Sequence, residues 1–140
     1  MDIGVPSYLI GVTLLGVVAQ RLVRTLCQSC KSPTQVSRAA WISLAGTLPL
    51  EPDEQFHRAV GCDDCRNTGF KGREGLYEIL RISESLAAMI NRGANSLSLR
   101  RRALEDGMLP LRHAGAIKVA LGRTTIEEVL SLSPFDRVDE

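Results

Sequence analysis

The sequence predicts an α+β fold that is mostly helical, and three observations carry that prediction. Apolar residues recur at helical spacing through residues 83–130, with helix caps between them. Two short stretches, residues 20–26 and 73–82, partly alternate between apolar and polar side chains, as strands do. Between them, residues 27–72 hold all four cysteines and a run of turn signals. We therefore expect two strands, a cysteine-rich subdomain and a helical C-terminal subdomain.

The first 26 residues predict a helix followed by a strand. Pro6-Ser7 is a helix start signal, and Gln20–Leu26 (QRLVRTL) is interpreted as the strand. The positions at helical spacing are Leu9, Val12, Thr13, Gly16, Val17 and Gln20. Such a helix is apolar nearly all round, which is typical of a buried helix. Because 140 residues offer little to bury it, we expect this chain to be the end of something larger.

The middle of the chain predicts one short helix and one strand. The helix is expected over residues 35–46, capped by Ser37 or Thr34. The strand is expected over residues 73–82 (REGLYEILRI). One face of this strand would hold Leu76, Leu80 and Ile82.

Four helices are expected after the second strand. Their apolar positions include Leu86, Met89 and Ile90 in the first, Leu97, Leu104 and Met108 in the second, and Val129 and Leu130 in the fourth. Glycines close the first three helices: Gly93, Gly107 and Gly122. Pro110 opens the third helix, and Thr124 with Glu127 forms a capping box for the fourth.

Composition excludes several classes of protein. The chain has 17 basic and 16 acidic residues, so its net charge of +1 argues against a strongly basic nucleic-acid binder and against an acidic tail protein. Aromatic residues make up only 4%, which disfavours base-stacking platforms. The longest apolar run, Tyr8–Ala19, is shorter than the roughly 20 residues that span a bilayer, and no basic residue precedes it as in a secretory signal. We expect a cytoplasmic protein whose thiols stay reduced.

The four cysteines predict a metal site. Cys27 and Cys30 form one C-x2-C pair, and Cys62 and Cys65 form a second one 31 residues later. Two-residue spacing lets one tight turn aim both sulfurs at a single ion, and two such turns make a tetrahedral four-sulfur site that suits Zn²⁺. The alternatives are two separate redox pairs or four buried thiols. His57 is a rival ligand, although the cysteine set is already complete.

Charged residues beside the cysteines bear on the same site. Four thiolates and one Zn²⁺ leave an excess of negative charge, which Arg24, Lys31 and Arg66 could offset. The carboxylates of Asp63 and Asp64 add further negative charge beside the thiolates, and we expect them to point to water. Nothing leaves an open coordination position, so the predicted site is structural rather than catalytic.

Motifs of common enzymes are missing from the sequence. The phosphate-binding pattern G-x-x-x-x-G-K-[ST] does not occur. The two histidines, His57 and His113, do not sit in a nucleophile arrangement. We therefore expect that this chain alone is not an enzyme and has no catalytic residues.

Four sequence blocks together resemble one family along nearly the whole chain. They are GVVAQRLVRTLC, the two C-x2-C pairs, NTGFKGREGLYEIL and EDGMLPLRHAGAIKVALGRTTIEEVL. They resemble the C-terminal portion of the GspE/PulE secretion ATPases, which power type II secretion and type IV pilus assembly. The family's two N-terminal modules, Walker A loop, aspartate and histidine boxes and Walker B segment are not in this sequence.

The resemblance implies a domain organisation and a role. Residues 1–26 would be the last helix and strand of a RecA-like ATPase core, 27–72 the tetracysteine zinc-binding subdomain, and 73–140 the returning strand plus a C-terminal helical subdomain. The full-length parent would be a homo-hexamer that uses ATP and magnesium, sits peripherally at the bacterial inner membrane and contacts platform proteins of the secretion or pilus system. Arg73 would lie near the nucleotide and help to neutralise phosphate charge. Its alternative role is that of a structural partner for the zinc subdomain.

Without the family resemblance, the sequence leaves two rival functions open. An independent zinc-ribbon module that binds nucleic acid is supported by Arg100-Arg101-Arg102, within a segment (97–123) of six basic and two acidic residues. The alternative for this triplet is a solvated helix face. A thiol–disulfide enzyme would instead use one C-x2-C pair and would not depend on zinc. The family resemblance favours an ATPase fragment with no nucleic-acid partner.

Overall fold

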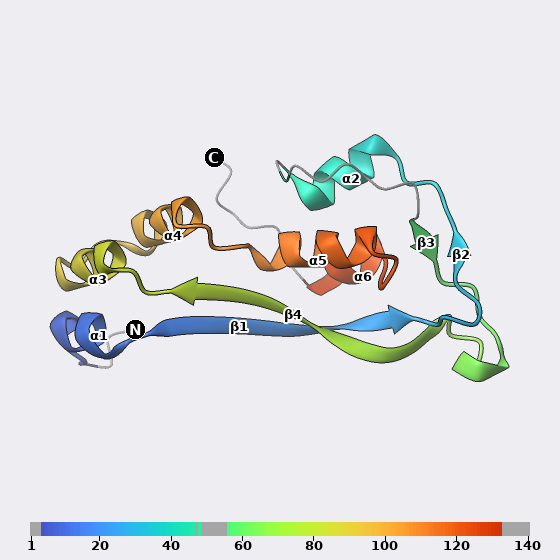
Figure 1. Cartoon of the computed structure of the whole chain (residues 1–140), viewed down its shortest axis with the longest axis horizontal. Helices are drawn as coiled ribbons and strands as arrows, with labels where there is room; N and C mark the ends of the chain where they lie inside the picture. Colours follow the sequence, from blue (N-terminus) through green and yellow to red (C-terminus); the bar gives the residue numbers. More distant parts are fainter. Residues whose placement is uncertain (1–3, 47, 49–55, 133–140) are drawn as a thin grey trace. The chain divides into compact units, whose positions relative to one another are not determined.

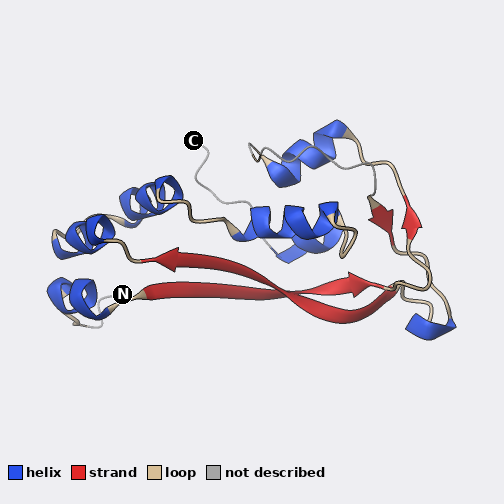
Figure 2. Ribbon diagram, viewed as in Figure 1, coloured by secondary structure: helices blue, strands red, loops and turns tan. Residues whose placement is uncertain are grey.

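The computed structural model describes residues 4–46, 48 and 56–132 of the chain. Over these residues the fold is mixed α+β, with six α-helices, one 3₁₀ helix and two two-stranded sheets (Figures 1 and 2). The strands are β1 (Gly16–Leu26), β2 (Ser32–Pro33), β3 (His57–Arg58) and β4 (Phe70–Arg81). The helices are α1 (Ser7–Thr13), α2 (Arg38–Ala45), η1 (Asp63–Cys65), α3 (Glu84–Asn91), α4 (Ser96–Glu105), α5 (Leu111–Ala120) and α6 (Ile126–Leu132). The predicted α+β class is confirmed.

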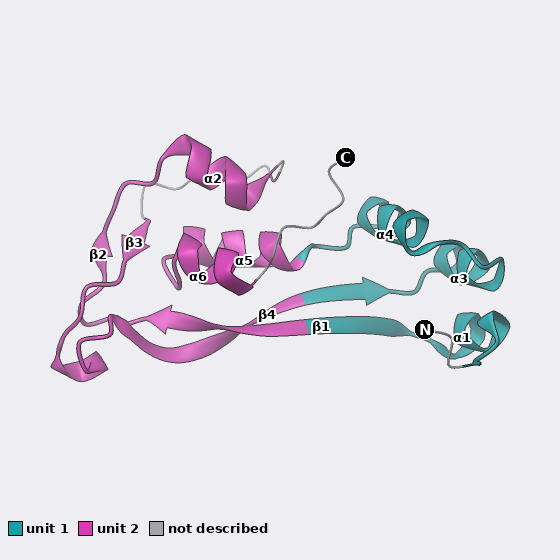
Figure 3. Ribbon diagram, turned by 180° about the vertical axis from the view of Figure 1, so that it is seen from behind, with its two compact units in different colours: residues 1–19, 78–110, 140 teal, residues 20–77, 111–139 magenta. Residues whose placement is uncertain are grey.

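The chain divides into two compact units (Figure 3). Over the described residues, unit 1 comprises 4–19 and 78–110, and unit 2 comprises 20–46, 48, 56–77 and 111–132. Strands β1 and β4 pair with each other, and each passes from one unit into the other. Strands β2 and β3 pair antiparallel within unit 2, with Ser32 opposite Arg58.

Unit 1 is built around the contact between α1 and α3. Gly11 of α1 lies so close to α3 that a Cβ there would stand 2.1 Å from the side-chain oxygen of Asn91. Ser83 caps α3 by accepting the amide of Leu86, and Asn95 caps α4 in the same way. The predicted apolar positions of the two helices lie within them, except that Met108 follows the end of α4.

Unit 2 holds the larger hydrophobic core. Helix α2 packs on α5 and α6, and the ring of Trp41 lies 5.1 Å from that of Phe56, tilted by 56°. The buried members of this core are Val23, Trp41, Leu44, Ala45, Phe56, Leu76, Ala116, Val119, Ile126 and Val129. Most of them are aliphatic, as the low aromatic content predicts. The predicted cap of α2 is confirmed at Ser37, whose hydroxyl accepts the amide of Ala40.

The prediction for the N-terminal segment is wrong in one respect. Helix α1 ends at Thr13 and β1 starts at Gly16, so the residues from Gly16 to Gln20 belong to the strand and not to the helix. Their apolar side chains fall at helical spacing by coincidence. A Cβ at position 16 would stand 2.8 Å from the carbonyl oxygen of Leu80, so glycine allows the close approach of β4. Helix α1 has no buried residue, which agrees with the expectation that this chain offers little to bury it.

The predicted start of the last helix is displaced by one residue. The hydroxyl of Thr125, rather than that of Thr124, accepts a helical amide, from Glu128 at 3.4 Å. The Thr124 side chain is fully buried and donates to the carbonyl oxygen of Arg24 at 2.9 Å. The expected strand at 73–82 is present but begins earlier, at Phe70.

None of the helices in the described part of the chain combines the length and the hydrophobicity that a membrane span requires.

Candidate metal centre

Two tight turns within unit 2 bring the four cysteines together. The first turn follows β1 directly: the amides of Cys30 and Lys31 both donate to the carbonyl oxygen of Cys27. The second turn precedes β4, and there the amides of Cys65 and Asn67 donate to the carbonyl oxygen of Cys62. In each turn the carbonyl oxygen of the first cysteine therefore accepts two amides, which holds the pair of cysteines within one turn.

The β1–β4 pairing places one turn beside the other. The amide of Cys27 donates to the carbonyl oxygen of Gly69 at 3.0 Å, just beyond the end of β1. Strand β2 follows the first turn and β3 precedes the second, and their antiparallel pairing leads the chain back toward the first turn. The cysteines are thus brought together by strand pairing although 31 residues separate the two pairs.

The sulfur positions fit a single tetrahedral ion. All four Sγ atoms lie within 4.8 Å of one another. The Cys27–Cys62 separation is 3.9 Å, and the Cys30–Cys65 and Cys62–Cys65 separations are both 3.8 Å. Four sulfurs held at tetrahedral angles, about 2.3 Å from one ion, stand about 3.8 Å apart. Three of the sulfur pairs stand near this separation, and the four free cysteines could therefore hold a metal ion.

Backbone amides point at two of the sulfurs. Cys65 Sγ accepts from the amides of Cys62 and Gly69, both at 3.2 Å, and Cys30 Sγ accepts from the amide of Gly61 at 3.3 Å. Burial raises the pKa of the Cys65 thiol, but its hydrogen bonds lower the pKa more, to about 6. Burial dominates at Cys30 and raises the pKa of that thiol to about 11. The two amides thus favour the thiolate form of Cys65.

Two glycines make these amide contacts possible. Gly69 has a φ of +76°, and a Cβ there would stand 2.6 Å from the Cβ of Ala59. Gly61 has a φ of +124°, and a Cβ there would stand 2.9 Å from the carbonyl oxygen of Asn67. Both positions need left-handed backbone and close approach, which favour glycine. The sequence analysis missed this role, although the glycines stand directly before Cys62 and four residues after Cys65.

The basic residues expected to offset the thiolate charge are engaged elsewhere. The Arg24 guanidinium binds the Glu128 carboxylate and lies 4.1 Å from the centre of the Phe70 ring. The ammonium of Lys31 donates to the carbonyl oxygen of Gly122 at 3.1 Å. Arg66 is exposed. Arg24 and Lys31 therefore bind other groups, so that their offset of the thiolate charge stays a prediction, and backbone amides donate hydrogen bonds to the sulfurs.

The two acids in the second turn behave differently from each other. Asp63 is exposed, as expected. Asp64 does not simply point to water: its carboxylate accepts the Ser29 hydroxyl at 2.8 Å and lies 3.3 Å from the Lys71 ammonium. The Ser29 hydrogen bond and then the Lys71 charge lower the pKa of Asp64. Asp64 therefore bridges the second turn to the first turn and to β4.

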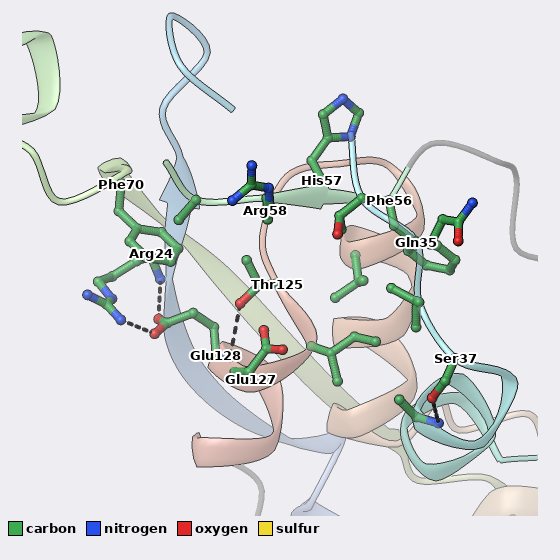
Figure 4. Close-up of a pocket in the computed structure, with 16 residues that line it drawn as sticks. Arg24, Gln35, Ser37, Phe56, His57, Arg58, Phe70, Thr125, Glu127 and Glu128 are labelled. Carbon is green, nitrogen blue, oxygen red and sulfur yellow. Dashed lines mark hydrogen bonds and ion pairs between the residues drawn. The ribbon is translucent and has the colours of Figure 1, made fainter. Parts of the chain in front are cut away.

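His57 lies outside the four-sulfur cluster, on β3. Its ring is close to Gly122, where a Cβ would stand 2.7 Å from Nδ1. It also borders a pocket of about 590 Å³ in unit 2, between β3, the segment before α2 and the start of α6 (Figure 4). The bound pair of Arg24 and Glu128 lines this pocket as well.

Arg73 lies on β4 and is exposed. Among the described residues its side chain has no recorded hydrogen bond or ion pair, whereas the next residue, Glu74, binds Lys118 at 2.5 Å. No hydrogen bond or ion pair joins Arg73 to the four-sulfur cluster within the described part of the chain.

The sequence matches the family described as Type II/IV secretion system protein over residues 1–131. The chain belongs to this family, and the predicted resemblance is confirmed. Type IV pilus assembly ATPase TfpB of Acinetobacter baylyi is 43% identical over 134 residues, which make up 96% of this chain and 23% of the relative. Type II secretion system protein E of Aeromonas hydrophila is 36% identical over 135 residues, 96% of this chain and 26% of the relative. The chain spans about a quarter of the length of these relatives.

Proposed function

We propose that this chain is the zinc-binding C-terminal part of a hexameric ATPase that powers type II secretion or pilus assembly. The observation that carries the proposal is the four-sulfur cluster at tetrahedral separations, in a chain that belongs to this family. Relatives named as a pilus assembly ATPase and as a type II secretion protein match nearly all of the chain. ATP and magnesium would be bound in the full-length parent.

Zinc is the ion that the donor set favours. Four cysteine thiolates select zinc or iron–sulfur chemistry, and a closed tetrahedral set with no open position is typical of a structural zinc. Cys27, Cys30, Cys62 and Cys65 would hold it. The ion would supply folding energy to residues 27–72 rather than reactivity. Residues 1–26 would complete a RecA-like core, and residues 73–140 would contribute contacts to neighbouring subunits.

The surroundings of the protein follow from the same proposal. The hexamer would act at the cytoplasmic face of the bacterial inner membrane, against platform proteins of the secretion or pilus system. Arg73, exposed on β4, would approach the nucleotide of the parent.

The nucleic-acid alternative is not favoured by the contacts of the arginine triplet. Arg100 pairs with Glu78 at 3.5 Å, and Arg102 pairs with Asp106 at 2.8 Å. Two of the three guanidinium groups are thus held by acids of the same unit. A nucleic-acid binder would have to break these pairs and would lose affinity steeply with salt.

The test of the proposal uses the full-length parent. Cys62→Ser should remove zinc and stop secretion or pilus assembly, because one ligand of four is lost. Asp63→Asn is the matched control, since it alters the exposed neighbouring side chain and should leave both zinc content and assembly unchanged. Normal assembly by a zinc-free Cys62→Ser protein would contradict the proposal. Salt-sensitive DNA or RNA binding by the 140-residue chain would favour the alternative.

A further inference from the structure

We propose that Ser29 and Asp64 form a clasp between the two cysteine turns that positions the four sulfurs for the metal ion. The inference rests on the proposed metal-binding function and goes beyond it, because neither residue is a metal ligand. Both are positioning residues: they act on the ion only through the cysteines beside them.

The clasp is defined by one side-chain hydrogen bond and one ion pair. Ser29 lies between the two cysteines of the first turn, and Asp64 lies between the two cysteines of the second. The Ser29 hydroxyl donates to one carboxylate oxygen of Asp64 at 2.8 Å. The other carboxylate oxygen lies 3.3 Å from the Lys71 ammonium on β4. The carboxylate is therefore held from two directions.

Besides the contacts between the sulfurs, the described part of the chain has one more hydrogen bond to a side chain between the turns: the amide of Gly61, directly before Cys62, donates to Cys30 Sγ at 3.3 Å. Each turn fixes its own pair of sulfurs by backbone hydrogen bonds, from Lys31 to Cys27 and from Asn67 to Cys62. Those bonds do not set the position of one pair relative to the other. That position depends on the Cys27–Gly69 backbone bond, on the bond from Gly61 to Cys30 Sγ and on the clasp, which is the one of the three made by two side chains.

The clasp matters most when the ion is absent. Without the ion, only the hydrogen bonds between the two turns hold the two pairs of sulfurs at their observed separations. A hydrogen bond between the turns keeps the sulfurs together and lowers the cost of ordering them when the ion enters. The same bond must break before the turns can open and release the ion. We therefore expect the clasp to slow metal loss.

The experiment measures zinc release from the 140-residue chain to a chromogenic chelator. Ser29→Ala and Asp64→Ala should each speed release by about three- to tenfold, the effect of one exposed charge-assisted hydrogen bond. The double variant should release zinc no faster than Asp64→Ala alone, because both changes remove the same bond. Ser29→Thr, which keeps the hydroxyl, should restore a release rate near that of the unmodified chain.

Asp63→Ala is the matched control. It removes the same negative charge from the same turn, but Asp63 has no side-chain partner recorded among the described residues. Its release rate should match that of the unmodified chain, and the thermal melting of α5 and α6 should be the same in every variant. Equal effects of Asp63→Ala and Asp64→Ala would overturn the proposal in favour of simple charge. An unchanged rate in Ser29→Ala would also overturn it.

A second measurement separates this inference from the proposed function. If the unmodified chain bound no zinc, the proposed function would fail. The clasp would then be tested in the metal-free chain by amide hydrogen exchange over residues 28–31. Ser29→Ala should exchange there faster than Asp63→Ala, and equal exchange would overturn the clasp.

Discussion

The guanidinium of Arg24, near the end of β1, binds the carboxylate of Glu128 in α6, 104 residues further along the chain. The amide of Arg24 also donates to Glu128 at 3.2 Å, and its carbonyl oxygen accepts the Thr124 hydroxyl at 2.9 Å. A backbone bond from Leu26 to the carbonyl oxygen of Arg123, at 2.8 Å, completes the connection. The strand that leads into the first cysteine turn is therefore tied to the last helix.

This connection predicts a stability difference that depends on pH. Glu128→Gln should lower the free energy of unfolding at pH 7 by about 1–3 kcal/mol, because the Glu128 carboxylate is largely buried and accepts charge-assisted hydrogen bonds. Arg24 holds the pKa of Glu128 below its ordinary value of 4.5. The difference in unfolding free energy between the unmodified chain and Glu128→Gln should therefore be largest above pH 4.5. It should shrink as the pH falls through the lower pKa that Glu128 has in the folded chain.

Urea unfolding at a series of pH values from 7 to 3 measures this difference. The control is Glu127→Gln, which changes an exposed neighbour on the same helix turn and should change stability little. The account of this pair would be wrong if both variants lost the same stability, or if the difference grew as the solution became more acidic.

Gly69 should not tolerate a side chain. Gly69→Ala would place a Cβ 2.6 Å from Ala59 in backbone with a φ of +76°, and would displace the amide that donates to Cys65 Sγ. We expect a loss of about 2 kcal/mol or more in unfolding free energy, together with faster zinc release. Gly93→Ala is the control, because its φ of +70° is similar and nothing lies within 4 Å of its Cβ. Zinc release as slow as in Gly93→Ala would contradict this explanation.

Arg73 is predicted to act on the nucleotide in the full-length parent. Arg73→Ala should reduce ATP turnover strongly while zinc content and melting temperature stay normal, and Arg73→Lys should restore turnover only in part, because lysine lacks the planar fork. Arg81→Ala, at another exposed position of β4, is the matched control and should keep its turnover. If Arg73→Ala instead loosened the zinc subdomain and lysine restored it fully, Arg73 would be a structural partner.

The 140-residue chain by itself should not hydrolyse ATP. It has no phosphate-binding loop with its lysine, and one arginine cannot hold a triphosphate and Mg²⁺. Calorimetry should detect at most weak ATP binding, and phosphate release should equal that of a heat-denatured sample. Tight binding in the calorimeter would refute the prediction.

The elements that carry local signals could be predicted from the sequence. Helices α3 and α4 are predicted from apolar positions such as Leu86 and Leu97 and from the closing glycines Gly93 and Gly107, and the structure has a helix at each place. The start of β1 could not be predicted, because Gly16 and Val17 fit helical spacing as well as they fit a strand. Only the pairing with Leu80 on β4 decides between the two. The β2–β3 pair is two residues long on each strand and depends on contacts that are remote in sequence.

In the cysteine site, too, the features with local sequence signals could be predicted and those that depend on remote contacts could not. The C-x2-C spacing is sufficient to predict that the four cysteines gather, because each turn is local. The partners of the charged neighbours depend on the folded chain: Arg24 meets Glu128, and Asp64 meets Ser29. Sequence distance to a cysteine is therefore a poor guide to which charges act on the sulfurs. The donor roles of Gly61 and Gly69 likewise appear only when their amide directions are known.

The most direct test of the account is the metal content of the 140-residue chain purified under reducing conditions. Elemental analysis should find one zinc per chain, and Cys62→Ser should lose the zinc and unfold residues 27–65, since zinc binding in small domains supplies roughly 10–16 kcal/mol. A zinc content near zero in a chain that keeps its fold would contradict the account.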